Sequence, residues 1–152
     1  MRTNVGLKLR TSNSNSSVFQ TPLLWYQTGD GSLTYTHIKT NITYNINIMY
    51  TFIAEGYNYG NSQAIYCSWS GYAYAGNPAG PVNTVYKDWY NGMSAHGAYY
   101  DGSGQLCLRA YASSSYFIGF HLHALMCNAN GFGTEPAVIA YAGTTNSGAY
   151  YT

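Results

Sequence analysis

The chain has 152 residues, the size of one domain, and only 7% of them are Asp, Glu, Lys or Arg, against roughly 25% in a typical soluble domain. Six basic and five acidic residues give a net charge of +1, which argues against the basic surface that nucleic-acid binding requires. No apolar run approaches the roughly 18 residues of a membrane-spanning helix, so we expect neither a nucleic acid nor a membrane as partner.

A surface this poor in charge favours burial against partner subunits, although Ser, Thr, Asn and Gly could also solvate a free monomer. Tyrosine occurs 18 times, and its apolar ring with a polar tip suits half-buried strand faces and interfaces. Cys67, Cys107 and Cys127 are widely spaced and form no CxxC pair. We interpret them as small buried apolar residues or as free thiols made in a reducing compartment.

Residues 1–31 differ from the rest of the chain. A polar stretch at 11–17 favours turns, and an apolar stretch at 19–26 follows it. We expect this segment to be an N-terminal arm that reaches onto a neighbour, or an edge segment of the sheet; an ordinary first strand and loop is the alternative. The β domain is then residues 32–152.

Strand patterns follow one another from Leu33 onward. The predicted strands are 33–39, 42–57, 64–75, 82–89, 105–112, 116–126 and 136–142. The longest, 42–57, alternates large apolar and polar residues with a period of two, and Gly56 within it is expected to seat a bulge. Residues 91–98 are predicted as loop, and 105–112 and 116–126 as adjacent antiparallel strands.

No segment shows a sustained helical period. About eight short strands separated by turns predict an all-β fold, an antiparallel β-sandwich that is jelly-roll-like.

His121 and His123 are the candidate metal ligands. In a strand, residues i and i+2 share a face, so both imidazoles could bind one ion while Leu122 faces the core. A third ligand would have to be His37, His96 or a cysteine. Because polar residues on the outer face of a strand or in a subunit interface are the more frequent explanation, we assign no metal and no cofactor.

The acidic residues suggest no catalytic site. They are Asp30, Glu55, Asp88, Asp101 and Glu135, and their positions reveal no pair of the kind that flanks a sugar in a glycoside hydrolase. Asp101 is expected to order a hairpin turn, and Glu55 to pair with Lys39 or Arg109 across the sheet. Nucleophile-elbow, phosphate-loop and dinucleotide motifs are absent from the sequence. We therefore predict no catalytic residue and a protein that is not an enzyme.

Aromatic residues flank the Pro/Gly-rich loop at 76–81. They are Trp69, Tyr72, Tyr74, Trp89 and Tyr90. Exposed aromatic rings stack on sugars, which would suit a receptor-binding tip, and burial in a subunit interface or at the ends of the sandwich is the alternative. These five residues are the candidate binding residues.

From about residue 33 to its end the chain resembles a virion protein module of tailed bacteriophages. The residues that carry the resemblance are Tyr35–Asn41, Met49–Tyr50, Glu55–Ser62, Cys67–Trp69, Gly92–Ala95, Tyr116–Phe120 and Asn146–Tyr151. The resemblance implies a structural protein located in the virion and assembled in the cytoplasm of a host bacterium. It does not choose between the head surface and a tail fibre.

Length favours the head. A tail fibre usually needs an attachment domain and a long shaft, and 152 residues beginning at Met1 fit a decoration, or cement, protein better. We expect a homotrimer that binds and stabilises the capsid through the major capsid protein or another virion protein, with cyclic symmetry covering sheet edges. The alternative is a receptor-binding module of a tail or head fibre that recognises host-surface glycans.

Overall fold

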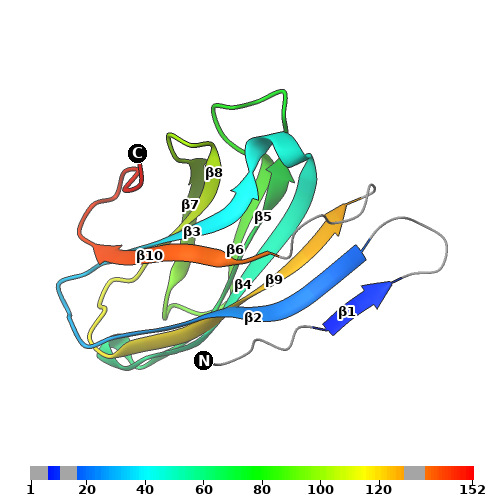
Figure 1. The fold of residues 1–152 in the computed structure, drawn as a ribbon. Helices are drawn as coiled ribbons and strands as arrows, with labels where there is room; N and C mark the ends of the chain where they lie inside the picture. The colour runs from blue at the N-terminus through cyan, green and yellow to red at the C-terminus, as the bar shows by residue number, and fades with distance from the viewer. Residues whose placement is uncertain (1–6, 11–16, 129–135) are drawn as a thin grey trace.

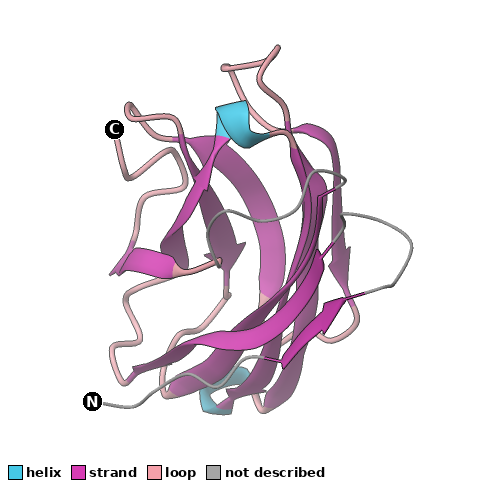
Figure 2. Ribbon diagram, turned by 45° about the vertical axis from the view of Figure 1, so that its right-hand side comes forward, coloured by secondary structure: helices cyan, strands magenta, loops and turns pink. Residues whose placement is uncertain are grey.

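The structure, a computed structural model, describes residues 7–10, 17–128 and 136–152, which form two antiparallel sheets packed against each other (Figures 1 and 2). The strands are β1 (Leu7–Arg10), β2 (Ser17–Thr28), β3 (Tyr35–Thr43), β4 (Ile48–Asn58), β5 (Gln63–Ala73), β6 (Val82–Asp88), β7 (Ser94–Tyr100), β8 (Gln105–Tyr111), β9 (Ile118–Asn128) and β10 (Val138–Thr144). The predicted all-β sandwich is confirmed, with ten strands in the described part of the chain instead of about eight.

The strand order is β1-β2-β9-β4-β5-β6 in the larger sheet and β10-β3-β8-β7 in the smaller one. Strand β2 pairs with β9 in the larger sheet, and β3 pairs with β8 in the smaller one. The second pair lies, in sequence, inside the segment that the first pair encloses, as in a jelly roll. Strands β5 and β6 extend the larger sheet beyond β4 (Figure 1). The core lies between the two sheets.

The prediction that the strands around 105–112 and 116–126 are neighbours is wrong, because β8 and β9 lie in different sheets. Their connection crosses the end of the sandwich instead of folding back as a hairpin. It is tied to the β2–β3 loop: Ala112 N donates to Thr34 O at 2.9 Å, and Ser115 Oγ donates to Asp30 O at 2.7 Å.

The single strand predicted for 42–57 is also wrong. The chain leaves β3 at Thr43, makes a 3₁₀ turn at Tyr44–Ile46 and enters β4 in the other sheet. Asn47 closes this turn with a φ of 52°, in the left-handed region that asparagine tolerates, and its side chain accepts a hydrogen bond from Ala75 N. Ile46 is consequently exposed, although it continues the alternation of the sequence.

Residues 91–98, predicted as loop, contain most of strand β7. Small residues such as Ala95 and Gly97 give this strand little intrinsic preference, and pairing with β8 decides its conformation. Two hydrogen bonds to side chains of β6 support this strand. Ala95 N donates to the Asp88 carboxylate at 2.7 Å, and Ala98 N donates to Tyr86 Oη at 3.1 Å.

Asp101 orders the β7–β8 hairpin turn as predicted. Its carboxylate accepts hydrogen bonds from Ser103 N and Gln105 N, both at 2.9 Å, and forms an ion pair with Lys39 of β3. Burial raises the pKa of this carboxyl, but Lys39 and the hydrogen bonds from Gln105 and Ser103 lower it further, so the pKa falls to about 2.

Replacing Asp101 by asparagine is expected to lower the free energy of unfolding by about 2 kcal/mol at pH 7, since a carboxylate whose pKa is lower in the folded chain favours folding while it is ionised. The folded pKa lies below the ordinary 3.8, so this stabilisation is complete above about pH 5 and is lost as the pH falls towards 2. Thermal melts of both proteins from pH 7 to pH 2 check this, and a difference in Tm that does not shrink with pH would contradict it.

Trp69 lies in the centre of the core. It is fully buried with its β4 neighbour Phe52, and its Nε1 donates to Arg109 O at 3.0 Å, which joins the larger sheet to the smaller one. Trp69 is therefore wrong as a candidate for surface binding.

Gly56 seats no bulge, because β4 keeps its register with β5 and β9 on both sides of it. A Cβ atom at this position would lie 2.1 Å from Gly119 O, so the glycine permits close approach of the β9 backbone.

Strand β2 is part of the sandwich. It pairs with β9 from Ser17 to Thr28, and Leu24 and Tyr26 are buried in the core. The division predicted after residue 31 thus falls in the β2–β3 loop, and the arm interpretation is left with β1, an edge strand, and with residues outside the described ranges. Within the described ranges there is no helix of the length and apolarity needed to cross a membrane.

Candidate functional site

The outer face of the six-stranded sheet presents side chains in cross-strand rows. One row runs across β9, β4, β5 and β6 and consists of Leu125, Thr51, Ser70 and Val85, with Met49 beside it on β4. Met49, Val85 and Leu125 are 53%, 49% and 44% exposed. We call these five residues the apolar row.

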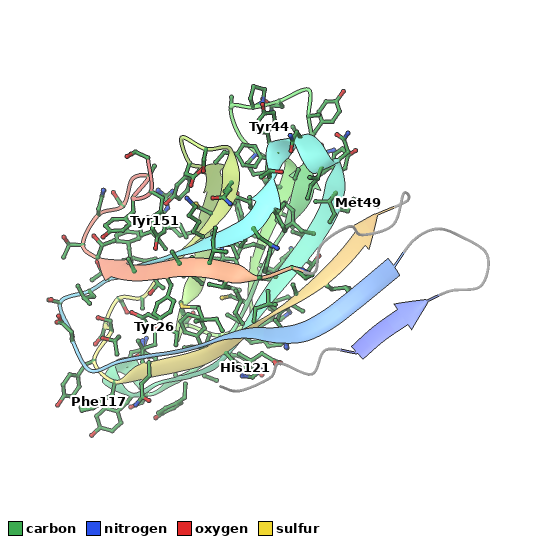
Figure 3. The ribbon with its side chains drawn as sticks, viewed as in Figure 1. Tyr26, Tyr44, Met49, Phe117, His121 and Tyr151 are labelled. Atoms are coloured by element: carbon green, nitrogen blue, oxygen red, sulfur yellow. The ribbon has the colours of Figure 1, made fainter. Side chains whose placement is uncertain are left out.

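A polar cluster occupies the next two rows along the same face. Glu55 of β4 is directly opposite His121 of β9, which is labelled in Figure 3. His123 follows on the same face because alternate residues of a strand point the same way. Both imidazole Nε2 atoms approach one carboxylate oxygen, Glu55 Oε2, at 3.0 Å from His121 and 3.5 Å from His123. One potential ligand atom from each of the three side chains lies within 4.8 Å of the other two.

The prediction that His121 and His123 share the outer face, with Leu122 in the core, is confirmed. Two other predictions about this region are wrong. Glu55 pairs with the two histidines, while Lys39 pairs with Asp101 and Arg109 donates to Ser147 O. The third side chain near the histidine pair is Glu55, since His37 is buried on the other sheet.

The cluster is partly buried, with side-chain exposures of 37% for Glu55, 28% for His121 and 17% for His123. Burial lowers the pKa of His123, Glu55 opposes this, and the neighbouring His121 lowers it further, so that the pKa lies below the ordinary 6.5. His123 is therefore neutral at pH 7, with a lone pair on one ring nitrogen. A neutral imidazole can accept a hydrogen bond or bind a metal ion.

A pocket of about 330 Å³ adjoins the cluster. Glu55 and His121 form part of its wall, together with Tyr26, Phe120 and the backbone of Gly56. Solvent and small molecules can therefore reach the polar cluster from one side.

The predicted aromatic residues do not form one surface. Tyr72 and Tyr74 stack with ring centroids 5.7 Å apart, whereas Trp89 packs on Tyr66 at 4.6 Å. Trp89 and Tyr90 are each more than half exposed, so they remain available for contact.

A second aromatic group was not predicted from the sequence. Tyr59, Tyr116 and Phe117 are all exposed, and their ring centroids lie 4.5–6.2 Å apart. Phe117 has a φ of 50°, an uncommon conformation for a large side chain. The sequence contained one signal for this group: two adjacent aromatic residues directly follow three serines. In a loop of this kind there is no core position in which the two rings could be buried.

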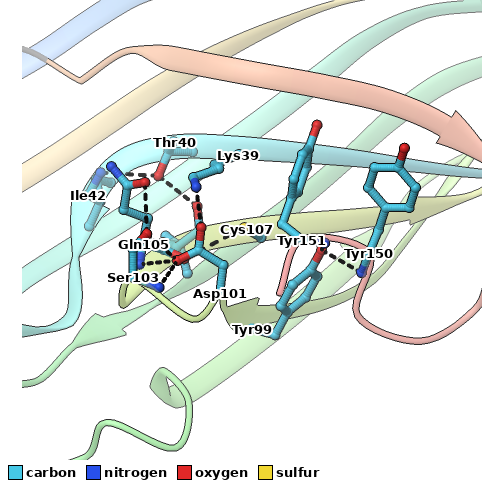
Figure 4. Close-up of polar contacts among 11 residues, drawn as sticks. Lys39, Thr40, Ile42, Tyr99, Asp101, Ser103, Gln105, Cys107, Tyr150 and Tyr151 are labelled. Atoms are coloured by element: carbon cyan, nitrogen blue, oxygen red, sulfur yellow. Dashed lines mark hydrogen bonds and ion pairs between the residues drawn. The ribbon is translucent and has the colours of Figure 1, made fainter.

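Residues 145–152, which we call the strap, cover the part of the outer face of the four-stranded sheet around His37 and Tyr99. Asn146 O accepts from His37 Nε2 at 3.1 Å. Tyr150 N and Tyr151 N donate to Tyr99 Oη (Figure 4). Tyr99 Oη in turn lies 3.0 Å from His37 Nδ1. The strap therefore buries His37 completely, although this residue lies on an outer face.

The other described carboxylates have structural partners. Asp30 Oδ1 accepts from Ser32 N at 2.9 Å, Asp88 holds β7, and Asp101 holds the β7–β8 turn. Together with Glu55, these three carboxylates lie in four separate parts of the fold. Glu135 is outside the described residues.

Fold and site together define an all-β sandwich with an exposed apolar row and a Glu–His–His cluster on the outer face of its larger sheet. No protein-family model, curated protein or solved structure matches the chain.

Proposed function

We propose that this protein is a non-enzymatic structural component of a bacteriophage virion, a capsid decoration protein that acts as a homotrimer. It binds the capsid through the outer face of its six-stranded sheet and stabilises the shell by burying surface. The resemblance to virion modules is the reason for proposing a phage particle as the assembly to which the protein belongs.

The apolar row is the observation that carries the proposal. Met49, Val85 and Leu125 are about half exposed and lie around Thr51 and Ser70, which bond to each other at 3.0 Å. Large apolar side chains that are exposed together on one face are candidates for an interaction site. A sheet face of hydroxyl and apolar side chains suits a permanent contact with another protein, since few charges need to be desolvated there.

Replacing Leu125 by glutamate is expected to reduce binding to capsids that lack the protein by at least tenfold, because the contact loses about 1.5–3 kcal/mol of apolar burial and must desolvate a charge. Cosedimentation of the purified chain with such capsids measures this. Immunogold electron microscopy of the parent particles should label the heads evenly.

Ile139→Glu is the matched control, because Ile139 is an equally exposed aliphatic residue on β10 of the other sheet. It should bind capsids like the unchanged protein. Equal binding by the Leu125 and Ile139 variants would remove this sheet face as the docking surface, and absence of label on heads would remove decoration.

A second candidate function is receptor binding by a tail or head fibre. The exposed Tyr59–Tyr116–Phe117 group and the ring of Trp89 favour it, since aromatic faces stack on sugars. Label confined to the tail, together with cell binding that is lost on Trp89→Ala, would support this function instead.

A further inference from the structure

We propose that Glu55, His121 and His123 form a binding site for a borderline divalent metal ion of the Zn²⁺, Co²⁺ and Ni²⁺ class. Two imidazole nitrogens and one carboxylate oxygen suit these ions better than Mg²⁺ or Ca²⁺, which prefer oxygen alone. The proposal does not rest on the capsid contact proposed above, although the cluster lies on the same sheet face.

The spacing of the three side chains fits such an ion. Zn–N and Zn–O bonds of about 2.0–2.2 Å place the ligand atoms of a tetrahedral site roughly 3.3–3.6 Å apart. Glu55 Oε2 lies 3.0 Å from His121 Nε2 and 3.5 Å from His123 Nε2. Since all three ligand atoms lie within 4.8 Å of one another, small rotations of the side chains would bring them onto one ion.

The backbone holds the three side chains in this relation. Glu55 and His121 are directly paired across β4 and β9, and both strands are interior to the six-stranded sheet. Ligands on paired interior strands are held more firmly than ligands on loops, which lowers the entropic cost of assembling a site.

The cluster contains a large share of the few acidic residues and histidines in the chain. The whole chain has five acidic residues and four histidines, and three of these nine meet here. Among the described residues, the ion-pair partners of Glu55 are the two histidines, and no Lys or Arg contacts it. A metal ion would supply the positive charge that this carboxylate otherwise receives only from a protonated imidazole.

Three protein ligands leave coordination positions open. The partial exposure of all three side chains and the adjoining pocket give an ion and its water ligands access from solvent. An open position of this kind accepts water, a small anion or a side chain of another protein.

Isothermal titration of the untagged protein with Zn²⁺ tests the proposal, and Co²⁺ absorption spectra report the coordination. We expect one equivalent of Zn²⁺ per chain and a visible Co²⁺ spectrum. Glu55→Gln, His121→Ala and His123→Ala should each weaken binding by at least about tenfold, the loss that even supporting residues of metal sites cause. His96→Ala is the matched control, because His96 lies on β7 of the other sheet, and it should bind like the unchanged protein.

Nuclear magnetic resonance of the imidazole protons gives a second reading that needs no variant to fold. On addition of Zn²⁺, the signals of His121 and His123 should shift together and the signal of His96 should stay in place. Failure of the unchanged protein to bind saturably, equal loss of binding in the His96 variant, or full affinity in Glu55→Gln would each overturn the three-ligand site.

Discussion

Replacing Asn58 by alanine is expected to lower the free energy of unfolding by roughly 3–5 kcal/mol, as the loss of a buried amide leaves several polar groups without partners. Asn58 ends β4 and is fully buried. Its Nδ2 donates to Gly92 O and Ser114 O, and its Oδ1 accepts from Gly60 N. One side chain thus holds three connections at the same end of the sandwich. Truncation would leave one buried carbonyl group, that of Gly92, and one partly buried carbonyl group, that of Ser114, without this partner.

Asn61 provides the control for this prediction. It lies in the same turn, and its Nδ2 makes one exposed hydrogen bond to Asn91 O, so Asn61→Ala should cost less than about 1 kcal/mol. Urea unfolding followed by circular dichroism measures both variants. Equal losses for Asn58→Ala and Asn61→Ala would show that the buried amide does not hold the connections together.

Removing the strap, residues 145–152, is expected to cost roughly 2–6 kcal/mol of stability and to expose Cys107. His37, Arg109 and Tyr99 lose four hydrogen bonds in total, each worth about 0.5–1.5 kcal/mol. Cys107 lies on the outer face of β8, near Tyr151 of the strap (Figure 4). Burial raises the pKa of its thiol to about 12. Water admitted by the deletion should bring that pKa back towards its ordinary 9.0 and allow the thiolate to react.

The rate of labelling by a thiol reagent measures this exposure, in a Cys127→Ser background so that two thiols remain. Cys67 serves as an internal control, because it is buried between the sheets and should stay unreactive with or without the strap. Labelling that is fast before the deletion, or unchanged after it, would show that the strap does not protect Cys107.

The sequence was sufficient to predict the fold class and the local faces of strands. Alternation at residues 118–124 identified the inward Phe120 and Leu122 and the outward His121 and His123, since a strand paired on both sides must follow that alternation. It could not show that Tyr44–Ile46 forms a turn. The reversal depends on a left-handed Asn47 and on a bond to Ala75, and neither interrupts the pattern of apolar residues.

The candidate site was predictable only in part. Its two histidines are two residues apart, but Glu55 precedes His121 by 66 residues and reaches it only because β9 lies beside β4. No local signal states which strands are neighbours. For the same reason the sequence suggested β8 and β9 as a hairpin, whereas contacts to Thr34 and Asp30 direct the connection to the other sheet.

The hydrogen bonds that attach the strap come from its peptide groups, while the Tyr150 ring packs on His37 and the Tyr151 ring lies near Lys39. The atoms that attach it are the carbonyl oxygens of Asn146 and Ser147 and the amide nitrogens of Tyr150 and Tyr151. These hydrogen bonds can therefore persist while side chains of the strap change, provided that proline, which lacks the amide proton, enters neither of the two tyrosine positions. A segment anchored in this way can carry new side chains to the molecular surface without disturbing the sheet beneath it.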